Sequence, residues 1–306
     1  MNTTAQEFHN VDSIAKTYDS NINSLQLLTA YIERDFDSDI KRARALFVWL
    51  TANISYDLND YNYGPKNYKF NYASPEELET KINTRKQDIV TFTMNYKRAV
   101  CEGYAETFKQ ACDLLNIDCV VISGYTRGSS WEIGKLPLEG NHAWNAMKIK
   151  NEWKLVDNTW GAGHSRDANH WVRDFDDYYF LVAPEELITS HYPEDKNWQL
   201  LSSPLNEKEF TNQPNYASLF FKEELQLIAP TTGIISGNDE FISIKLIGAS
   251  NDTEFGYAFD NDYYLTTIIP EINGGITTLN IPRKNKKKIA LKILIDTDMI
   301  VKFYVD

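Results

Sequence analysis

Cys101, His142 and Asp157 are the residues of this sequence whose types and order could carry out nucleophilic chemistry. A thiolate attacks a carbonyl carbon, a histidine within hydrogen-bond reach moves the proton, and a carboxylate fixes the tautomer of that histidine and stabilises its charged form. Each residue also has an ordinary structural explanation: a packed thiol, a hydrogen-bonded histidine and a solvated residue at a strand end. The chemical hypothesis therefore depends on whether the fold brings the three together.

The segment after Cys101 has the period of an amphipathic helix, with apolar residues at Tyr104, Ala105, Phe108, Ala111, Cys112 and Leu115. Cys101 is therefore predicted at or just before the first turn of a helix that ends near Asn116. Unpaired N–H groups and the positive end of the helix dipole at such a position favour a thiolate over a thiol. Cys112 and Cys119 are predicted to pack in the core, and three cysteines without a CxxC motif leave at least one thiol free.

His142 and Asp157 are predicted to lie on one face of a β-hairpin, with His142 at the start of the first strand and Asp157 at the end of the second. If Ile149 pairs with Glu152 across a two-residue turn, Asp157 lies opposite Trp144. His142 shares the face of Trp144 because side chains alternate along a strand. The two residues are then diagonal neighbours, about 7 Å apart at the backbone and within side-chain reach. A three-residue turn would place them on opposite faces.

Helices and strands follow one another along the chain in a mixed pattern. Apolar residues recur at three- and four-residue spacing over residues 11–53, which predicts helices. Residues 57–72 are predicted to be a loop, and Ser74-Pro75-Glu76-Glu77 to open a short helix. Residues 116–160 have the pattern of strands, and six to eight short strands over residues 226–306 predict a β-sandwich or barrel.

Two stretches of this sequence, RAVCEGYAETFKQACDLLNIDCVVISGY and NHAWNAMKIKNEWKLVDNTWGAG, resemble the core signature of the transglutaminase-like superfamily of papain-like Cys-His-Asp enzymes. The specific motifs are a cysteine before Gly-Tyr-Ala, then His-Ala-Trp-Asn, then Asp-x-Thr-Trp-Gly, in that order. The flanking segments KRARALFVWLTANISYD and DYYFLVAPEELITSHYPEDKNWQLL resemble bacterial and fungal relatives of the kyphoscoliosis peptidase group. The resemblance covers about residues 10–205.

The resemblance implies Cys101 as the nucleophile, His142 as general acid and base, and Asp157 as the group that orients His142. Asn158 departs slightly from the pattern, since relatives commonly have Thr or Pro there. The implied fold class is α+β. It is a papain-like or transglutaminase-like core, with N-terminal helices packed on an antiparallel sheet, followed by an all-β sandwich-like C-terminal domain.

An oxyanion hole and domain boundaries are expected as well. The backbone N–H of Cys101 is a natural first donor, while Trp160, Gln87 and Asn141 remain open alternatives for the side-chain donor. The polar, proline-containing segment after residue 202 predicts a linker. The expected domains are therefore a catalytic domain over 1–205, a linker over 206–222 and a β-sandwich-like domain over 223–306.

Composition limits the partners and cofactors. A formal net charge of −12 repels phosphate backbones and anionic membrane surfaces, so no nucleic acid is expected. No apolar run has the roughly 18 to 20 residues that a membrane-spanning helix needs. Cysteine, histidine and aspartate can bind zinc, but no CxxC or HxxxH accompanies the three residues, so neither a metal nor a cofactor is expected.

The sequence leaves several functions open. The expected function is that of a thiol enzyme acting on peptide or amide bonds of a protein or peptide substrate. Release of the thioester by water makes it a peptidase or deamidase, and release by an amine makes it a transglutaminase; the resemblance favours hydrolysis. The alternatives are a catalytically silent protein-binding scaffold and a structural role at the cell surface. The oligomeric state stays open, as does the compartment, which could be the cytoplasm or the exterior after loss of a signal peptide.

Overall fold

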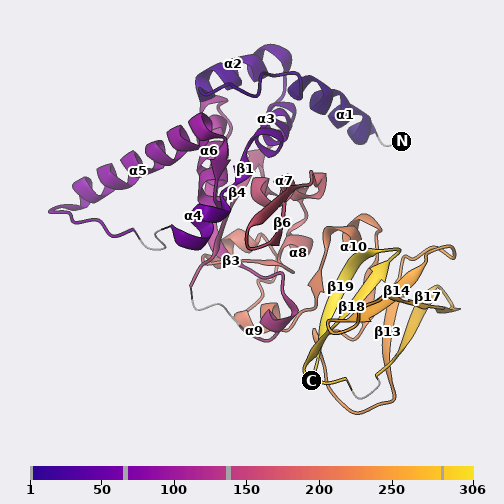
Figure 1. Ribbon diagram of the computed structural model, residues 1–306. Coiled ribbons are helices and arrows are strands. Elements are labelled where there is room, and N and C mark those ends of the chain that lie inside the picture. Colours follow the sequence, from indigo (N-terminus) through magenta and orange to yellow (C-terminus); the bar gives the residue numbers. More distant parts are fainter. Residues whose placement is uncertain (1–2, 65–67, 136–138, 284–285) are drawn as a thin grey trace. The chain divides into compact units, whose positions relative to one another are not determined.

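The computed structural model describes residues 3–64, 68–135, 139–283 and 286–306 (Figure 1). The chain folds into two compact units. The first consists of residues 1–123 and 142–183, and the second of residues 124–141 and 184–306. The first unit contains all three residues of the candidate site.

Helices form the N-terminal part of the first unit, as the apolar spacing predicted: α1 (Thr3–Ala15), α2 (Leu25–Asp35) and α3 (Asp39–Asn53). The middle of α3 is buried on all sides, because every residue from Ala43 to Thr51 is excluded from solvent. This helix packs against α1, α2, α6 (Cys101–Leu114) and α7 (Asn158–Ala162). The burial makes α3 the centre of the first unit.

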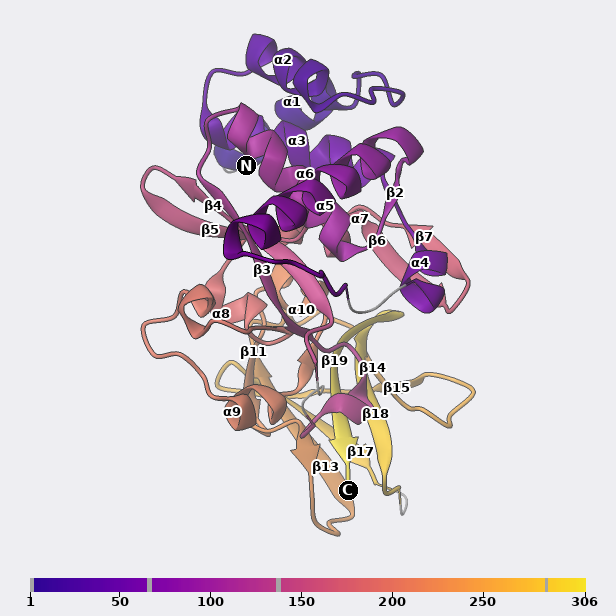
Figure 2. The same ribbon diagram turned by 90° about the vertical axis from the view of Figure 1, so that its left-hand side faces the viewer.

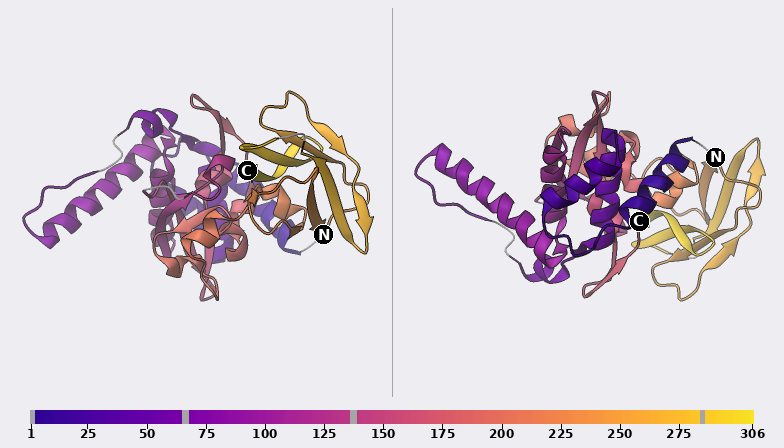
Figure 3. Two further views of the ribbon diagram at one scale, coloured as in Figure 1. Left: turned by 90° about the horizontal axis from the view of Figure 1, so that it is seen from below. Right: turned by 90° about the horizontal axis from the view of Figure 1, so that it is seen from above.

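Two helices occupy the region in which a loop and a short helix were predicted. Residues 57–72 contain α4 (Leu58–Tyr63), which begins because the Asp57 side chain accepts a hydrogen bond from the Asp60 N–H. The predicted short helix is α5 (Pro75–Tyr96), which has 22 residues. Its start is as predicted, because Ser74 is the N-cap. The N-terminal end of α5 projects from the rest of the first unit (Figures 1 and 3).

A sheet in the order β8-β5-β4-β3 supports the candidate site. Its strands are β3 (Cys119–Thr126), β4 (His142–Ile149), β5 (Glu152–Val156) and β8 (Phe180–Val182), and β5 pairs antiparallel with both β4 and β8. Helix α6 packs on β4 and lies beside α3 (Figure 2). The buried Asn145 amide ties β4 to α6 by donating to the Ala105 carbonyl at 3.0 Å. The predicted core of helices on an antiparallel sheet is confirmed.

The residues after Asp157 differ from the prediction. The strand-like segment 153–160 ends as a strand at Val156, and α7 follows because the Asp157 carboxylate caps its first turn. The segment that follows α7 and carries His164 and His170 is a hairpin of β6 (Gly163–Asp167) and β7 (His170–Arg173). A short 3₁₀ helix, η2 (Asp177–Tyr179), then leads to β8.

The C-terminal part of the second unit is all-β, as predicted. Its sheets have the orders β10-β19-β18-β14-β15, with β12 also paired to β19, and β11-β13-β17-β16. A single apolar core, which includes Ile244, Leu279 and Phe303, joins residues of both sheets. The strands are β10 (Asn215–Tyr216), β11 (Gln226–Ala229), β12 (Ile234–Ile235), β13 (Phe241–Ile247), β14 (Phe255–Phe259), β15 (Thr266–Ile268), β16 (Glu271–Asn273), β17 (Ile276–Pro282), β18 (Ile289–Ile295) and β19 (Asp298–Val305).

Short elements fill the remainder of the second unit. They are η1 (Ser130–Glu132), α8 (Pro184–Leu187), β9 (His191–Pro193), η3 (Lys196–Gln199), α9 (Glu207–Thr211) and α10 (Ser218–Lys222). The buried Arg127 guanidinium donates to the backbone carbonyls of Thr189, Thr211, Gln213 and Pro214. Two of these elements, α9 and α10, lie together with the strand β10 in the segment predicted as a linker. Where the chain separates into independently folding domains stays a prediction.

Candidate active site

Cys101 is the first residue of α6, and its side chain is half-buried. Two residues earlier in the chain, β2 (Arg98–Ala99) pairs in parallel with β1 (Ser55–Tyr56) and fixes the approach to the helix. A Cβ on Gly103 would lie 2.6 Å from the Ala99 Cβ, so only glycine allows this close approach. The predicted position at a helix N-terminus is confirmed. Cys101 therefore lies at the positive end of the helix dipole.

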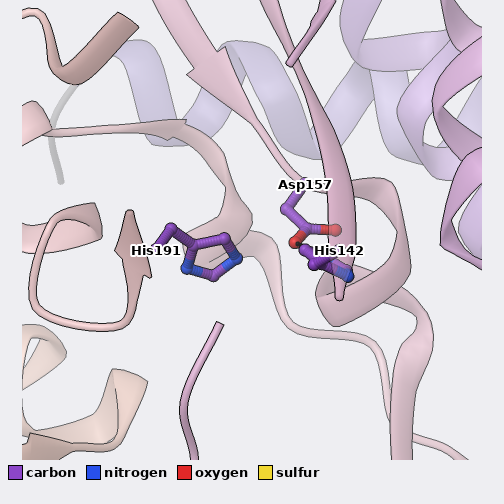
Figure 4. A group of neighbouring side chains, drawn as sticks. All are labelled: His142, Asp157 and His191. Atoms are coloured by element: carbon purple, nitrogen blue, oxygen red, sulfur yellow. Dashed lines mark hydrogen bonds and ion pairs between the residues drawn. The ribbon is translucent and has the colours of Figure 1, made fainter. Parts of the chain in front are cut away.

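His142 and Asp157 are joined by a hydrogen bond of 2.6 Å between Nε2 and Oδ2 (Figure 4). The hairpin that carries them has the predicted register, because Ile149 pairs with Glu152 across a two-residue turn. Both side chains are buried; Asp157 is 0% exposed. The prediction that the two residues lie within side-chain reach is confirmed. His191, also drawn in Figure 4, belongs to the second unit, where it lies in β9.

The Asp157 carboxylate is held in place from its other side. Its Oδ1 accepts hydrogen bonds from the backbone N–H groups of Thr159 at 2.7 Å and Trp160 at 3.0 Å. The same residue therefore begins α7 and presents its second oxygen to His142. The neighbouring Asn158 is buried, and its amide group has no hydrogen-bond partner among the described residues.

Charge stabilises the protonated form of His142. Burial alone would lower the pKa of the imidazole, but the charge and hydrogen bond of Asp157, together with a hydrogen bond to the Cys101 side chain, outweigh it and raise the pKa to about 10. The structure thus brings Cys101, His142 and Asp157 together in one hydrogen-bonded series. Near neutral pH the imidazole carries a proton that it can give to a leaving group.

Aromatic rings surround the histidine. The Trp144 ring is stacked at 6.0 Å between centroids, and the Trp160 ring lies at 6.1 Å, tilted by 54°. Trp160 in turn meets the edge of the Tyr179 ring. These rings keep water from His142 and Asp157, and exclusion of water strengthens the electrostatic interactions between them.

Three residues were considered from the sequence as the side-chain donor of an oxyanion hole, and their contacts do not single out one of them. Both ends of the Asn141 amide are bonded to the backbone of Thr126, at 2.7 and 3.0 Å. Gln87 is exposed on α5, and Trp160 lies beside His142 as described above. The role of each of the three stays a prediction.

Tyr56 is a site residue that the sequence analysis did not single out. It pairs with Ala99, so the strand β1 carries it next to the start of α6. Burial, followed by the charge of Cys101, raises the pKa of its hydroxyl, which keeps the phenol protonated near neutral pH. Only the segment NISYD, within the flanking stretch that resembles relatives, could have indicated it.

Known proteins resemble this chain over two thirds or more of its length. Residues 27–158 match the family model described as the transglutaminase-like superfamily. A protein named kyphoscoliosis peptidase from Homo sapiens is 28% identical over 77% of this chain and 33% of its own length. Hillarin of Drosophila melanogaster is 27% identical over 76% of this chain and 28% of its own. Cytokinesis protein 3 of Saccharomyces cerevisiae is 25% identical over 72% of this chain and 23% of its own length.

The match over residues 27–158 and the relatives found confirm the resemblance to the transglutaminase-like superfamily that was stated from the sequence. The chain is similar to proteins named kyphoscoliosis peptidase from Homo sapiens and Mus musculus. It spans about a third of the length of these relatives. A solved structure described as a TGase aligns with 60% of this chain at 18% identity, with a TM-score of 0.31 that carries no weight for the fold. Across the described part of the chain, no helix is both long and apolar enough to cross a membrane.

Proposed function

We propose that this protein is a thiol enzyme that acts on peptide or amide bonds of proteins through Cys101, His142 and Asp157. The observation that carries the proposal is the buried 2.6 Å hydrogen bond between His142 and Asp157. The side chain of the half-buried Cys101 forms a hydrogen bond with the same imidazole. Homology to proteins named as peptidases supports hydrolysis over acyl transfer. No step of this chemistry needs a cofactor.

In the first half of the reaction, the Cys101 thiolate forms a bond to the carbonyl carbon of the substrate. The negative charge moves to the carbonyl oxygen, and in this proposal the Cys101 N–H and the Tyr56 hydroxyl donate hydrogen bonds to it; their positions at and near the start of α6 support these roles. The imidazolium of His142 then gives its proton to the amide nitrogen. The C–N bond breaks, an amine leaves and a thioester remains.

In the second half, the neutral His142 takes a proton from water as the oxygen attacks the thioester. Collapse of this intermediate releases a carboxylic acid and restores the thiolate and the imidazolium. Asp157 stabilises the charged imidazole in both halves. If a primary amine attacks instead of water, the same steps yield a new amide bond, which is acyl transfer.

Casein provides a test of both outcomes, because its hydrolysis and its labelling by a fluorescent primary amine can be measured on one sample. We expect wild type to cleave or label casein and Cys101→Ala to do neither. Cys119→Ala is the matched control, because that thiol is buried and takes no part in the reaction. Full activity of Cys101→Ala on casein would contradict the mechanism.

A catalytically silent scaffold is the second candidate. It is favoured by the two exposed rings Tyr263 and Tyr264 in the all-β part, 97% and 86% accessible, which are suited to contact a partner. The two candidates differ in thiol chemistry. If the protein is an enzyme, iodoacetamide at pH 6 should alkylate Cys101 much faster than it alkylates free cysteine. His142→Gln should abolish this difference in rate. Equal rates in both proteins would favour the scaffold.

A further inference from the structure

A cavity of about 810 Å³ lies in the first unit, next to Cys101. It is lined by α4, by the segment 68–70, by one side of α5 and by the start of α6. Val100, Glu102 and Gly103, the neighbours of the nucleophile in the chain, all line it. Its volume falls within the range of about 300 to 1,000 Å³ that proteins use for ligands and exceeds that of a single side chain. Cys101 itself is not among the lining residues, so a molecule bound here would lie against the first turn of α6, which Cys101 begins.

Two arginines are built into the wall of this cavity, and both are neutralised there. Arg85 forms a bidentate ion pair with Glu102 and lies over the Tyr68 ring at 4.4 Å. Arg98 pairs with Asp57 at 3.2 Å and lies over the Phe92 ring at 5.6 Å. Each cation is therefore held between a carboxylate and an aromatic ring. These arginines offer little attraction to an anionic ligand.

The remaining charge of the cavity is negative. Asp60 on α4 and Asp88 on α5 both line it and are exposed. Among the residues that the structure describes, neither carboxylate forms an ion pair with a basic side chain. Lys81, the third base in the lining, is already paired with Glu77 at 2.7 Å. The cavity thus combines aromatic walls with two uncompensated carboxylates, which is the combination that binds a cationic side chain.

We propose that this cavity binds arginine or lysine side chains of the peptide substrate, next to the bond that Cys101 attacks. The role in catalysis rests on the proposed function, whereas the binding itself does not. Asp60 and Asp88 supply the counter-charges, and the rings of Tyr68, Phe70 and Phe92 cover the aliphatic part of the side chain. The proposal makes the enzyme selective for basic segments of its protein substrates.

The test is fluorescence anisotropy with the full-length Cys101→Ala protein, which cannot turn the peptide over. Three fluorescein-labelled pentapeptides are compared: one with two arginines, its citrulline isostere and its glutamate counterpart. We expect the arginine peptide to bind best and to lose affinity as NaCl is raised. In a Cys101→Ala background, Asp60→Asn with Asp88→Asn should weaken its binding roughly two- to tenfold and leave the citrulline peptide unchanged.

A matched control removes the same charge from the same region without touching the cavity. Glu79→Gln on α5 with Asp113→Asn on α6 changes two exposed acidic residues that do not line it, and it should leave arginine-peptide binding unchanged. Equal binding of the arginine and citrulline peptides, or an equal loss in the control, would overturn the proposal. If wild type cleaves casein but either of these two binding results is found, the binding proposal alone has failed. Selective arginine binding without thiol chemistry would show that the proposed function alone has failed.

Discussion

The two oxygens of Asp157 have separate partners, since Oδ1 caps α7 and Oδ2 holds His142. Asp157→Asn keeps the size of the side chain but removes the charge that stabilises the imidazolium. We expect kcat on casein to fall by about 10³- to 10⁴-fold, as in other enzymes that lose the carboxylate of a triad. Asp174→Asn is the control, because it removes an exposed carboxylate 3.6 Å from His164. A fall of less than tenfold would contradict the assigned role.

The raised pKa of His142 also predicts how stability depends on pH. The folded protein binds this proton more tightly than the unfolded chain, with a pKa of about 10 against 6.5. The stabilisation is therefore complete below pH 6.5 and is lost as the pH rises toward 10. The free energy of unfolding, measured with urea, should be lower at pH 9 than at pH 6.5 in wild type. The difference between the two pH values should be smaller in His142→Gln. The same loss in both proteins would exclude His142 as its source.

The proposed mechanism gives Tyr56, which pairs with Ala99 near the start of α6, the role of a hydrogen-bond donor to the oxyanion. Tyr56→Phe removes only the hydroxyl, so we expect kcat to fall by about 10²-fold while the rate of Cys101 alkylation stays the same. Tyr61→Phe, whose ring lies 5.8 Å from that of Tyr56, controls for loss of a neighbouring hydroxyl. A change in alkylation alone would assign Tyr56 to the thiol and not to the oxyanion.

At the scale of elements, the β4–β5 hairpin could be predicted because its register depends on local features. Lys150 and Asn151 take positive φ values of 51° and 65°, and a two-residue turn of this kind fixes the pairing of the strands on either side. Tyr56 could not be predicted in the same way. Its neighbour Ala99 is more than forty residues away along the chain, and the parallel pairing of β1 and β2 joins segments of only two residues.

Helix α4 and the full length of α5, both beside the cavity, were not predicted for a related reason. Helix α4 has no buried residues, so its sequence lacks the periodic apolar residues that predict a helix. The N-cap Asp57 is the feature of its sequence that indicates where it begins. Helix α5 buries only Val90, Thr93 and Met94, near its C-terminal end, so most of its length carries no apolar stripe. Elements that line a binding cavity bury little surface of their own, which makes them the hardest to predict from the sequence.

The close packing of α6 against β2 gives a prediction for Gly103. A Cβ there would also lie 2.9 Å from the Thr93 Oγ1, so Gly103→Ala must displace the first turn of α6. We expect a loss of about 1 to 3 kcal/mol in the free energy of unfolding, measured with urea, and reduced casein turnover. Gly128→Ala is the control, because a Cβ there meets nothing within 4 Å. Unchanged stability of Gly103→Ala would show that the turn can absorb the methyl group.

At the scale of the whole molecule, the all-β part was predictable because its strands alternate between buried and exposed residues. In β13 the pattern is regular, with Ile242, Ile244 and Leu246 buried and the intervening Ser243 and Lys245 exposed. The boundary of this part was harder to predict, because residues 206–222 are polar at their start. Phe220, on α10, nevertheless belongs to the same apolar core, and Tyr216 packs against that core.

The boundary of the C-terminal domain can be tested with two fragments. Fragment 223–306 follows the predicted boundary, but it lacks β10, which pairs with β19, and Phe220 of the core. Loss of a buried phenylalanine costs about 3 to 5 kcal/mol, a large share of the stability of a small domain. We therefore expect fragment 206–306 to unfold cooperatively in urea and fragment 223–306 to unfold at a clearly lower midpoint. Equal midpoints would place the domain boundary at residue 223, and α10 would then contribute nothing to the stability of the β-sandwich.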